Sequence, residues 1–553
     1  IKRYCINPVD SKIADESVPQ TLKIDFEIPD DVETVEGFIS MDEKALRECY
    51  SDLSLAMTFD DFKFIQNYLK NDENRKKLSM DLRSDFERDY HRILSSPSFR
   101  RLQDKTQVFP LEKNDFIRTR LTHSIEVSSF AKSLAQSVAS EIMRQGLDSE
   151  FNYEEANAIS DILASSGLLH DIGNPPFGHF GEDTIRTWFH RNLDKITMKN
   201  SKGEEKKLGE ILNPQMCGDL LNFEGNAQAI RVAAKLHFLI DENGMNLTYA
   251  LLNTLIKYPV DSLNIDKKSS DIKTKKMGYN LAEKNLFEKI VQSTGTKNEE
   301  TGEVYRHPLT FLLEAADDIA YCTADVEDGV KKKFIKFEEL VEALCEAIPE
   351  NKKLHEDLIN YKQHARERKY DDPELYAVQR WAVKIQGIFI RAVVGSFIQN
   401  YDAIMNGEYK KDLFADTEAE ILLKTLKKLA YNEVFDAKAI VKMEVTANNI
   451  INYFLDNFIS SVLYWDTEYE DEMQGIDRKY LSIISETHRY IYSYYSELYA
   501  GSEEISQISD NNEKKEKLYS YKLYLRILLV TDYISGMTDS FMKTLYQELI
   551  GIE

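Results

Sequence analysis

Apolar side chains recur every three or four positions along most of the chain, which is the spacing of helices with one buried face. One such stripe consists of Val127, Ala131, Leu134, Val138 and Ile142. A second apolar run, at 159–171, is followed by Gly173 and two prolines, which end a helix. Because the 553 residues include only 22 Gly and 12 Pro, the pattern predicts a mainly α fold.

The beginning of the chain departs from this helical pattern. Apolar residues alternate with polar ones at Leu22, Ile24, Phe26 and Ile28. This alternation predicts a strand with one buried face, and the spacing turns helical from 41 to 74. We therefore expect a small α+β appendage at 1–75, a helical core at 76–340 and a helical C-terminal region at 341–553.

Polar stretches between the helical segments predict surface insertions. They lie at 201–207, 266–276, 293–303 and 502–517. The tyrosine-rich stretch 490–499 (YIYSYYSELY) fits a packed amphipathic helix better than a platform on which bases stack.

The formal net charge of −24 repels polyanions and argues against a protein that coats duplex DNA. The segment 100–120 is the exception, with six basic and three acidic residues; it could hold an anion or be a solvated charged loop. Five cysteines without a CxxC pair argue against a disulfide framework or a thiolate zinc site and favour the cytoplasm. No membrane association is expected, because no apolar run approaches the length of a membrane span.

A third helical stripe carries two carboxylates. Leu313, Asp317, Tyr321 and Asp325 recur every four residues and so share one helical face. A buried carboxylate is costly unless it is paired or bound to a cation, so Asp317 either faces a cation or lies on an exposed stripe.

Two histidines and a further aspartate complete a candidate metal set with Asp317. His123 lies near the start of the first helix, while His170 and Asp171 lie at the end of the second. Imidazole nitrogens and carboxylate oxygens together suit a six-coordinate divalent ion such as Mn²⁺, Fe²⁺ or Mg²⁺. A lone histidine is commonly a core residue, but a histidine, a later HD pair and a distant aspartate in this order are typical of the HD-domain superfamily.

Six longer strings make this resemblance specific. They are SFRRLQDKTQVFPL (98–111), RTRLTHSIEV (118–127), LLHDIGNPPFGHFGE (168–182), FEGNAQAIR (223–231), LTFLLEAADDIAYCTADVEDGV (309–330) and DYISGMTD (532–539). They resemble the bacterial deoxyguanosinetriphosphate triphosphohydrolase (dGTPase) family over about residues 80–553.

The resemblance implies roles for individual residues. The implied metal ligands are His123, His170, Asp171 and Asp317, with Asp318 as a solvated or helix-pairing acid. The implied catalytic pair is His179, beside the α-phosphate, and Glu182, which orients it. The implied substrate contacts are Gln103 at the deoxyribose, Arg120 at the phosphates, Lys257 and Tyr258 near phosphates and sugar, and Tyr321 and Asp325 at the sugar and its 3′-hydroxyl. For Arg100, Arg101 and Lys105, a structural or nucleic-acid-facing charge and a substrate contact remain equal alternatives.

The activity that the resemblance implies is hydrolysis of dGTP to deoxyguanosine and tripolyphosphate, with one Mn²⁺ or Mg²⁺ per subunit, or Fe²⁺. A homohexamer and a single-stranded DNA ligand are further expectations. The sequence contains neither a GxxxxGK[ST] loop nor a convincing Ser-His-Asp arrangement, which favours attack by water at the α-phosphorus. The alternatives are a nucleotidase or phosphodiesterase on the same core, and a regulatory or nucleic-acid-binding HD protein.

The first 75 residues carry a different resemblance. YCINPVDSKIADE, VETVEGFISMDEKAL and LSLAMTFDDFKFIQNYLKNDENR are similar to the linker domain of a large phosphoribosylformylglycinamidine synthase. Because the ATP-grasping and glutaminase parts of that enzyme are absent from the sequence, we expect a non-catalytic appendage.

Overall fold

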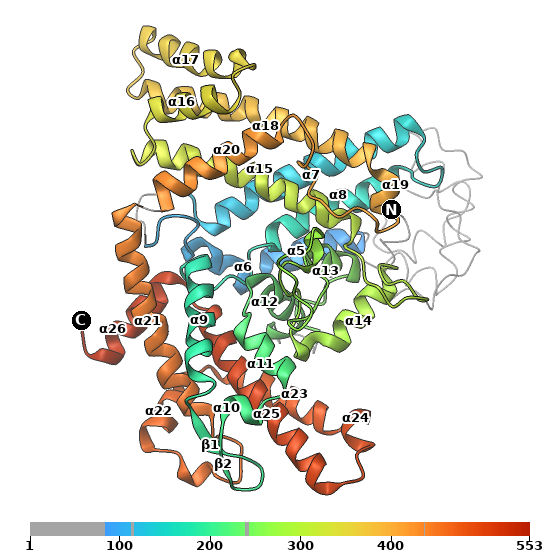
Figure 1. The fold of residues 1–553 in the computed structure, drawn as a ribbon, viewed down its shortest axis with the longest axis vertical. Helices are drawn as coiled ribbons and strands as arrows, with labels where there is room; N and C mark the ends of the chain where they lie inside the picture. Colours follow the sequence, from blue (N-terminus) through green and yellow to red (C-terminus); the bar gives the residue numbers. More distant parts are fainter. Residues whose placement is uncertain (1–82, 112–115, 238–242, 436, 553) are drawn as a thin grey trace, which may run out of the picture. The chain divides into compact units, whose positions relative to one another are not determined.

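The structure is a computed structural model that describes residues 83–111, 116–237, 243–435 and 437–552 (Figure 1). Helices make up nearly all of its regular structure, which confirms the predicted mainly α fold. The strand predicted at 22–28 and the helix predicted at 41–74 lie outside the described residues.

The helices and strands follow one another along the chain in the order given below. The first half contains α5 (Asp85–Ser95), α6 (Pro97–Arg101), the 3₁₀ turn η3 (Leu102–Asp104), α7 (Arg120–Gln145), α8 (Tyr153–Leu169), α9 (Gly178–Asn192), β1 (Thr197–Lys199), β2 (Glu205–Lys207), α10 (Leu208–Ile211), α11 (Pro214–Leu221), α12 (Gly225–Arg231) and α13 (Tyr249–Leu255). The second half contains α14 (Lys284–Ser293), α15 (Pro308–Lys331), α16 (Phe337–Ala347), α17 (Lys352–Glu367), α18 (Pro373–Gln399), α19 (Tyr401–Met405), α20 (Glu420–Ala430), α21 (Lys438–Val462), α22 (Gly475–Ile483), α23 (Glu486–Ala500), α24 (Glu503–Ser506), α25 (Asn511–Ser535) and α26 (Asp539–Ile550).

The first hydrophobic core is built around α7, α8 and α15, which pack against one another and, for α7 and α15, against α18. The predicted stripe of α7, from Val127 to Ile142, is buried in this core, as the sequence indicated. The helix begins at Arg120 because the Thr119 side chain accepts a hydrogen bond from the Thr122 N–H and caps it. His123 is thereby fixed in the first turn of α7.

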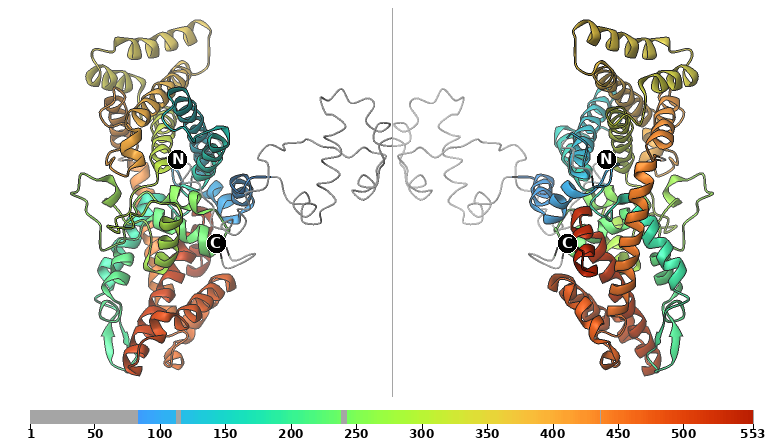
Figure 2. Two further views of the ribbon diagram at one scale, coloured as in Figure 1. Left: turned by 90° about the vertical axis from the view of Figure 1, so that its right-hand side faces the viewer. Right: turned by 90° about the vertical axis from the view of Figure 1, so that its left-hand side faces the viewer.

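The second hydrophobic core joins α9 to the C-terminal helices α21 and α25, which lie below the first core in Figure 1. Trp188 of α9 is buried there, and its indole N–H donates to Asp456 Oδ1 of α21 at 2.7 Å. The antiparallel hairpin β1–β2 lies at the end opposite α16 and α17 (Figure 2). The second core therefore holds in place the helix whose first turn carries His179.

The structure refines the predicted element boundaries. α8 begins at Tyr153, six residues before the predicted start, because the side chains of Asn152 and Glu155 form a capping box. The stretch 201–207 is part of the hairpin β1–β2, and 502–517 is largely exposed, as predicted, but is helical over α24 and the start of α25. The predicted boundary at residue 340 lies within α16, and the division into domains stays a prediction.

The tyrosine-rich stretch belongs to α23, which packs on α25. Ile491 and Tyr492 are buried, and the ring of Tyr499 stacks on that of Tyr521 with 3.6 Å between the centroids. These contacts agree with the predicted packed amphipathic helix.

Among the described helices, α18 is long and apolar enough to cross a membrane by length and composition alone. Its buried side chains include Trp381, Phe389 and Phe397, which belong to the first hydrophobic core. In the structure α18 packs on α7, α15 and α17.

Candidate functional site

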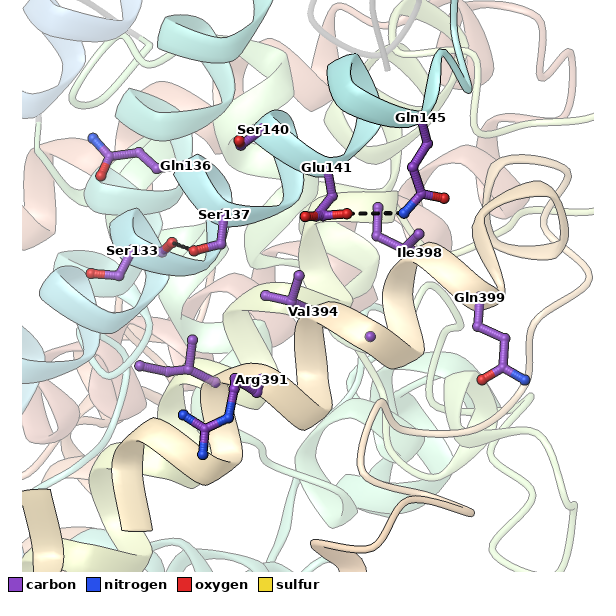
Figure 3. Close-up of a pocket in the computed structure, with 12 residues that line it drawn as sticks. Ser133, Gln136, Ser137, Ser140, Glu141, Gln145, Arg391, Val394, Ile398 and Gln399 are labelled. Carbon is purple, nitrogen blue, oxygen red and sulfur yellow. Dashed lines mark hydrogen bonds between the residues drawn. The ribbon is translucent and has the colours of Figure 1, made fainter. Parts of the chain in front are cut away.

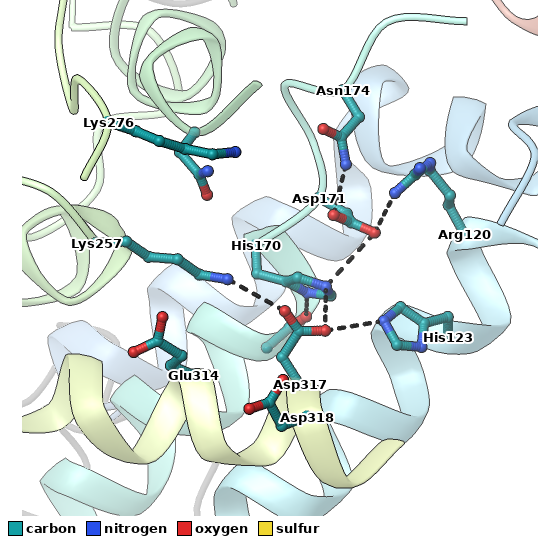
Figure 4. Close-up of polar contacts among 12 residues, drawn as sticks. Arg120, His123, His170, Asp171, Asn174, Lys257, Lys276, Glu314, Asp317 and Asp318 are labelled. Carbon is teal, nitrogen blue, oxygen red and sulfur yellow. Dashed lines mark hydrogen bonds and ion pairs between the residues drawn. The ribbon is translucent and has the colours of Figure 1, made fainter. Parts of the chain in front are cut away.

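The structure brings the four predicted metal ligands together from three elements (Figure 4). His123 Nε2 lies 3.2 Å from Asp317 Oδ1, and His170 Nε2 lies 3.5 Å from the same oxygen. His170 Nε2 is also 3.5 Å from Asp171 Oδ2, and ligand atoms of the two histidines and Asp171 all lie within 4.8 Å of one another. The sequence-based set therefore forms one cluster, while the role of its members as ligands stays a prediction.

The donor atoms of this cluster suit a cation. His170 donates through Nδ1 to the Gly167 carbonyl oxygen at 2.8 Å, which leaves its Nε2 as the atom that faces Asp171 and Asp317. This buried Nε2 makes no hydrogen bond with any described residue. A backbone carbonyl that fixes the outer nitrogen of a histidine is the usual support of a metal-binding imidazole.

The two carboxylates are held ionised by neighbouring cations. Asp171 accepts from Arg120 Nη1 at 2.5 Å and from Asn174 Nδ2 at 2.5 Å, and Asp317 accepts from Lys257 Nζ at 3.1 Å. Burial alone would raise the pKa of each acid, but Arg120 beside Asp171 and Lys257 beside Asp317 lower both pKa values. Both aspartates thus present the negative charge that a divalent ion needs.

The predicted catalytic pair occupies the first turns of α9. His179 Nδ1 lies 2.9 Å from Glu182 Oε2, and the His179 side chain is 77% exposed whereas that of Glu182 is 1% exposed. The second oxygen of Glu182 accepts from the Gly225 N–H at 2.7 Å. The hydrogen bond that His179 donates to Glu182 raises the pKa of His179, so more of its imidazole is protonated near neutral pH.

Two glycines allow the close approaches around this pair. Gly178 has a φ of +60°, and a Cβ there would lie 2.5 Å from Arg120 Nη2. A Cβ at Gly225 would lie 2.6 Å from Glu182 Oε1. Glycine at these positions lets Arg120 lie against the start of α9 and lets a backbone N–H reach Glu182.

Comparison with known proteins identifies the family. The HD domain family matches residues 120–248, a range that includes His123, His170, Asp171, His179 and Glu182. The deoxyguanosinetriphosphate triphosphohydrolase-like protein of Listeria monocytogenes is 45% identical over 491 residues, which cover 88% of this chain and 99% of that protein. The chain belongs to the dGTPase family of the HD superfamily.

More distant relatives extend the same match. A deoxyguanosinetriphosphate triphosphohydrolase-like protein of Synechocystis is 32% identical over 475 residues, and the deoxyguanosinetriphosphate triphosphohydrolase of Yersinia enterocolitica is 31% identical over 506 residues. Each alignment covers 85% of this chain and 94% of the relative. The predictions of the family and of a hydrolase are thereby confirmed.

The predicted sugar contacts of this dGTPase family member lie on α15, one and two turns beyond Asp317. Tyr321 is half-buried and hydrogen-bonds to Asp325, which is 2% exposed. Burial raises the pKa of Asp325, and its Oδ2 has no hydrogen-bond partner among the described residues. A buried acceptor of this kind fits a ligand hydroxyl group, which would supply the missing hydrogen bond.

The other predicted substrate residues differ in how closely the structure ties them to the cluster. Arg120 and Lys257 contact the carboxylates directly, and Tyr258, next in the chain, is half-buried. Gln103 lies in η3 with its side chain exposed, and no hydrogen bond among the described residues joins it to the cluster. Its role stays a prediction.

The basic segment 100–120 is mostly engaged within the protein. Lys105 is 4% exposed and donates to the carbonyl oxygens of Asn174 at 2.6 Å and Ser535 at 2.7 Å. Arg118 pairs with three acids, Glu126, Glu327 and Asp328. The open alternative for Lys105 is thus resolved in favour of a structural contact, while Arg100 and Arg101 are exposed and each donates to a backbone carbonyl.

Sequence reasoning missed a third cation near the cluster. Lys276, within a stretch predicted only as a surface insertion, points from the same side as Lys257, opposite Arg120 (Figure 4). Its Nζ lies 2.9 Å from Oε1 of Glu224, which is 3% exposed. The string FEGN was the sequence feature that could have pointed to Lys276. Its Glu224 accepts a hydrogen bond from Lys276, and its Gly225 N–H donates one to Glu182.

Asp318 was predicted as a solvated or helix-pairing acid. It accepts from Lys427 Nζ of α20 at 2.6 Å, and burial raises its pKa to about 6. This inter-helix ion pair agrees with a role outside the metal set.

A groove of about 840 Å³ lies away from this site, between the C-terminal half of α7 and α18 (Figure 3). Its lining on α7 begins at Ser133, ten residues and therefore about 15 Å along the helix from His123. The groove is separate from the cluster that carries the chemistry.

Proposed function

We propose that the chain hydrolyses deoxynucleoside triphosphates, dGTP by preference, to the deoxynucleoside and tripolyphosphate. The observation that supports this is the meeting of His123, His170, Asp171 and Asp317 beside three cationic side chains and the pair His179–Glu182. The names of the relatives specify dGTP for those proteins, and the preference is carried over as part of the proposal.

The four clustered side chains would hold one divalent ion, Mn²⁺ or Mg²⁺, with Fe²⁺ as a third option. Bound there, the ion would act as a Lewis acid on the α-phosphate and lower the pKa of a water molecule. Two carboxylates and two imidazoles are donors of the type that divalent first-row metals prefer.

Arg120, Lys257 and Lys276 would hold the polyphosphate. They approach the cluster from two sides, so a triphosphate between them would have negative charge neutralised along its length (Figure 4). Gln103, Tyr258, Tyr321 and Asp325 would contact the deoxynucleoside, with Asp325 accepting the 3′-hydroxyl.

His179 would move a proton at Nε2. Glu182 holds Nδ1, and the high exposure of the imidazole leaves Nε2 open toward a ligand. When water attacks the α-phosphorus, the bond from phosphorus to the 5′ oxygen breaks, and the imidazolium can donate a proton to the departing oxygen. The free deoxynucleoside and intact tripolyphosphate are the products.

The test is product identification with purified protein, Mn²⁺ or Mg²⁺ and a panel of the four dNTPs, with GTP as the ribose control. Phosphorus NMR and chromatography should show tripolyphosphate and deoxynucleoside, fastest with dGTP. Release of dGMP and pyrophosphate would refute the proposed bond cleavage.

A matched pair of variants on α9 then tests the role of His179. His179→Ala should lower kcat by about 10²- to 10⁴-fold with little change in the thermal midpoint, because the side chain is exposed and acid–base help is lost. His190→Ala, an exposed histidine at the other end of the same helix, should retain activity. Equal activity of the two variants would contradict the assignment.

A homohexamer, a cytoplasmic location and single-stranded DNA as a ligand complete the proposal. Light scattering after gel filtration and titration with a labelled oligonucleotide test the first and the last.

A further inference from the structure

The segment 172–177 connects the metal cluster to the catalytic pair. It follows Asp171, contains two prolines and ends at Phe177, which has a φ of +63° and no side-chain cap for α9. The direction in which α9 leaves this turn decides where His179 lies relative to the cluster. A left-handed conformation at a bulky residue needs support from its surroundings.

The support comes from Asp539, 362 positions further along the chain. Asp539 is 2% exposed, and its Oδ1 accepts from the Phe177 N–H at 3.0 Å. Its Oδ2 accepts from the Thr106 N–H at 3.0 Å and from the Thr106 hydroxyl. One carboxylate thus takes three hydrogen bonds from two segments that flank the site.

The connecting segment is also held at Asn174, by a residue next to Thr106. Lys105, the neighbour of Thr106, donates to the carbonyl oxygens of Asn174 and Ser535. The Lys105 carbonyl oxygen in turn accepts from the Arg120 N–H at 3.1 Å, at the start of α7. Residues 105–106 and 535–539 therefore fix the segment at Asn174 and again at Phe177.

We propose that Asp539 is a positioning residue for His179: its buried carboxylate holds the Phe177–Gly178 turn from which α9 begins. This inference rests on the proposed function, since His179 matters only if it acts on a substrate. The hydrogen bonds of Asp539 go to Thr106 and to the Phe177 N–H, so Asp539 would act on His179 through the backbone. The carboxylate is required because an amide offers one acceptor oxygen, whereas donors lie on both sides of this group.

Asp539→Asn should lower kcat for dGTP by about 10- to 100-fold, the size expected when a reacting group is displaced by about 1 Å. KM should change by less than about threefold, because the phosphate-binding cations stay in place. The neighbouring Ser540→Ala removes an exposed hydrogen bond to Asp104 Oδ1 and should leave kcat unchanged.

A double-mutant cycle separates positioning from general stabilisation. If Asp539 acts through His179, then Asp539→Asn should have no further effect on the residual activity of His179→Ala. Additive losses in the double variant would overturn the inference. Should Asp539→Asn fold poorly, Thr106→Val removes a single hydrogen bond and should show the same non-additivity with a smaller loss of kcat.

Hydrogen exchange tests the inference without turnover. In Asp539→Asn, deuterium uptake should rise about tenfold or more in peptides that span 173–182, while α21 and α25 keep their protection. Unchanged uptake at 173–182 would overturn the inference whatever the activity. If the wild-type protein releases no tripolyphosphate from any dNTP, the proposed function fails, and hydrogen exchange still decides whether Asp539 holds the turn.

Discussion

Two buried clusters of charged residues in this molecule use similar side chains in opposite ways. In the first, Arg231 of α12 is 3% exposed and donates to both oxygens of Asp532 at 2.6 to 2.9 Å. Its remaining nitrogen donates to Glu283 at 2.8 Å, and Gln228 adds a further hydrogen bond to Asp532. All three nitrogens of the guanidinium are thus engaged within the protein.

The metal cluster leaves hydrogen-bonding capacity open instead. His170 Nε2 and His123 Nδ1 are buried without a hydrogen-bond partner among the described residues, and Asp317 remains 24% exposed. Arg120 and Lys257 neutralise the acids from the edge of the cluster. The difference teaches that an ionic cluster whose central cation is fully hydrogen-bonded stabilises the fold, even though Glu283 Oε2 lacks a partner among the described residues, whereas a cluster with open ring nitrogens is available for a ligand.

The largest effect should come from removing a carboxylate of the metal cluster. Asp317→Ala should lower the affinity for Mn²⁺ by more than about 100-fold and should abolish measurable turnover. This loss exceeds the one expected for a residue that only hydrogen-bonds to a metal ligand. The free energy of unfolding should fall by less than for a fully buried ion pair, because Lys257 and Asp317 keep 12% and 24% of their side chains exposed. Calorimetric Mn²⁺ titration and urea unfolding measure the two quantities.

The adjacent Asp318→Asn is the control for this variant. It alters the ion pair with Lys427 on the outer side of the same helix and should retain Mn²⁺ binding. Loss of metal binding in both variants would show that α15 had been disturbed as a whole.

The cluster around Arg231 should instead respond mainly in stability. Arg231→Met should lower the free energy of unfolding by about 3–5 kcal/mol, because it leaves Asp532 buried without its cation, while Glu283 keeps only Lys235. The folded fraction should keep its metal affinity. Urea unfolding of Arg231→Met is compared with Arg478→Met, whose guanidinium is 47% exposed and whose loss should cost less than about 1 kcal/mol.

The smallest effect concerns pH. Glu182 raises the pKa of His179, so the imidazolium is present at low pH and is lost as pH rises through that raised value. The plot of kcat/KM against pH should therefore fall on its alkaline side. Glu182→Gln should move this fall to lower pH, and Asp183→Asn, next in the chain and 70% exposed, should not move it. If Glu182→Gln left the pH profile unshifted, the group whose ionisation causes the alkaline fall would not be His179.

The sequence predicted those parts of the site that depend on local pattern. The apolar stripe of α7 and the breaker residues after α8 placed His123, His170 and Asp171 correctly on their elements, and the four-residue repeat placed Asp317 on the inner face of α15. Periodicity suffices here because each helix must bury one face.

The parts that were missed depend on contacts between distant segments. Lys276 lies in a polar stretch without periodicity, and only its ion pair with Glu224, 52 positions away, directs it to the site. In the sequence, Asp539 is an ordinary acidic residue in the first turn of a helix. Only the folded structure shows that it accepts a hydrogen bond from the Phe177 N–H. No local pattern encodes such pairings, because they form only when both hydrophobic cores are assembled.

The contact between Phe177 and Asp539 also predicts the order in which metal binding and activity return during refolding. The metal ligands lie between residues 123 and 317 and belong to elements of the first core, whereas the turn before His179 must await a contact closed over 362 positions. Closing 362 rather than 194 positions costs less than about 1 kcal/mol more in chain entropy; the delay comes instead from the second core, which must assemble before α26 brings Asp539 to Phe177. A refolding chain should thus bind Mn²⁺ before it regains turnover, and should pass through an intermediate that binds the metal but is inactive.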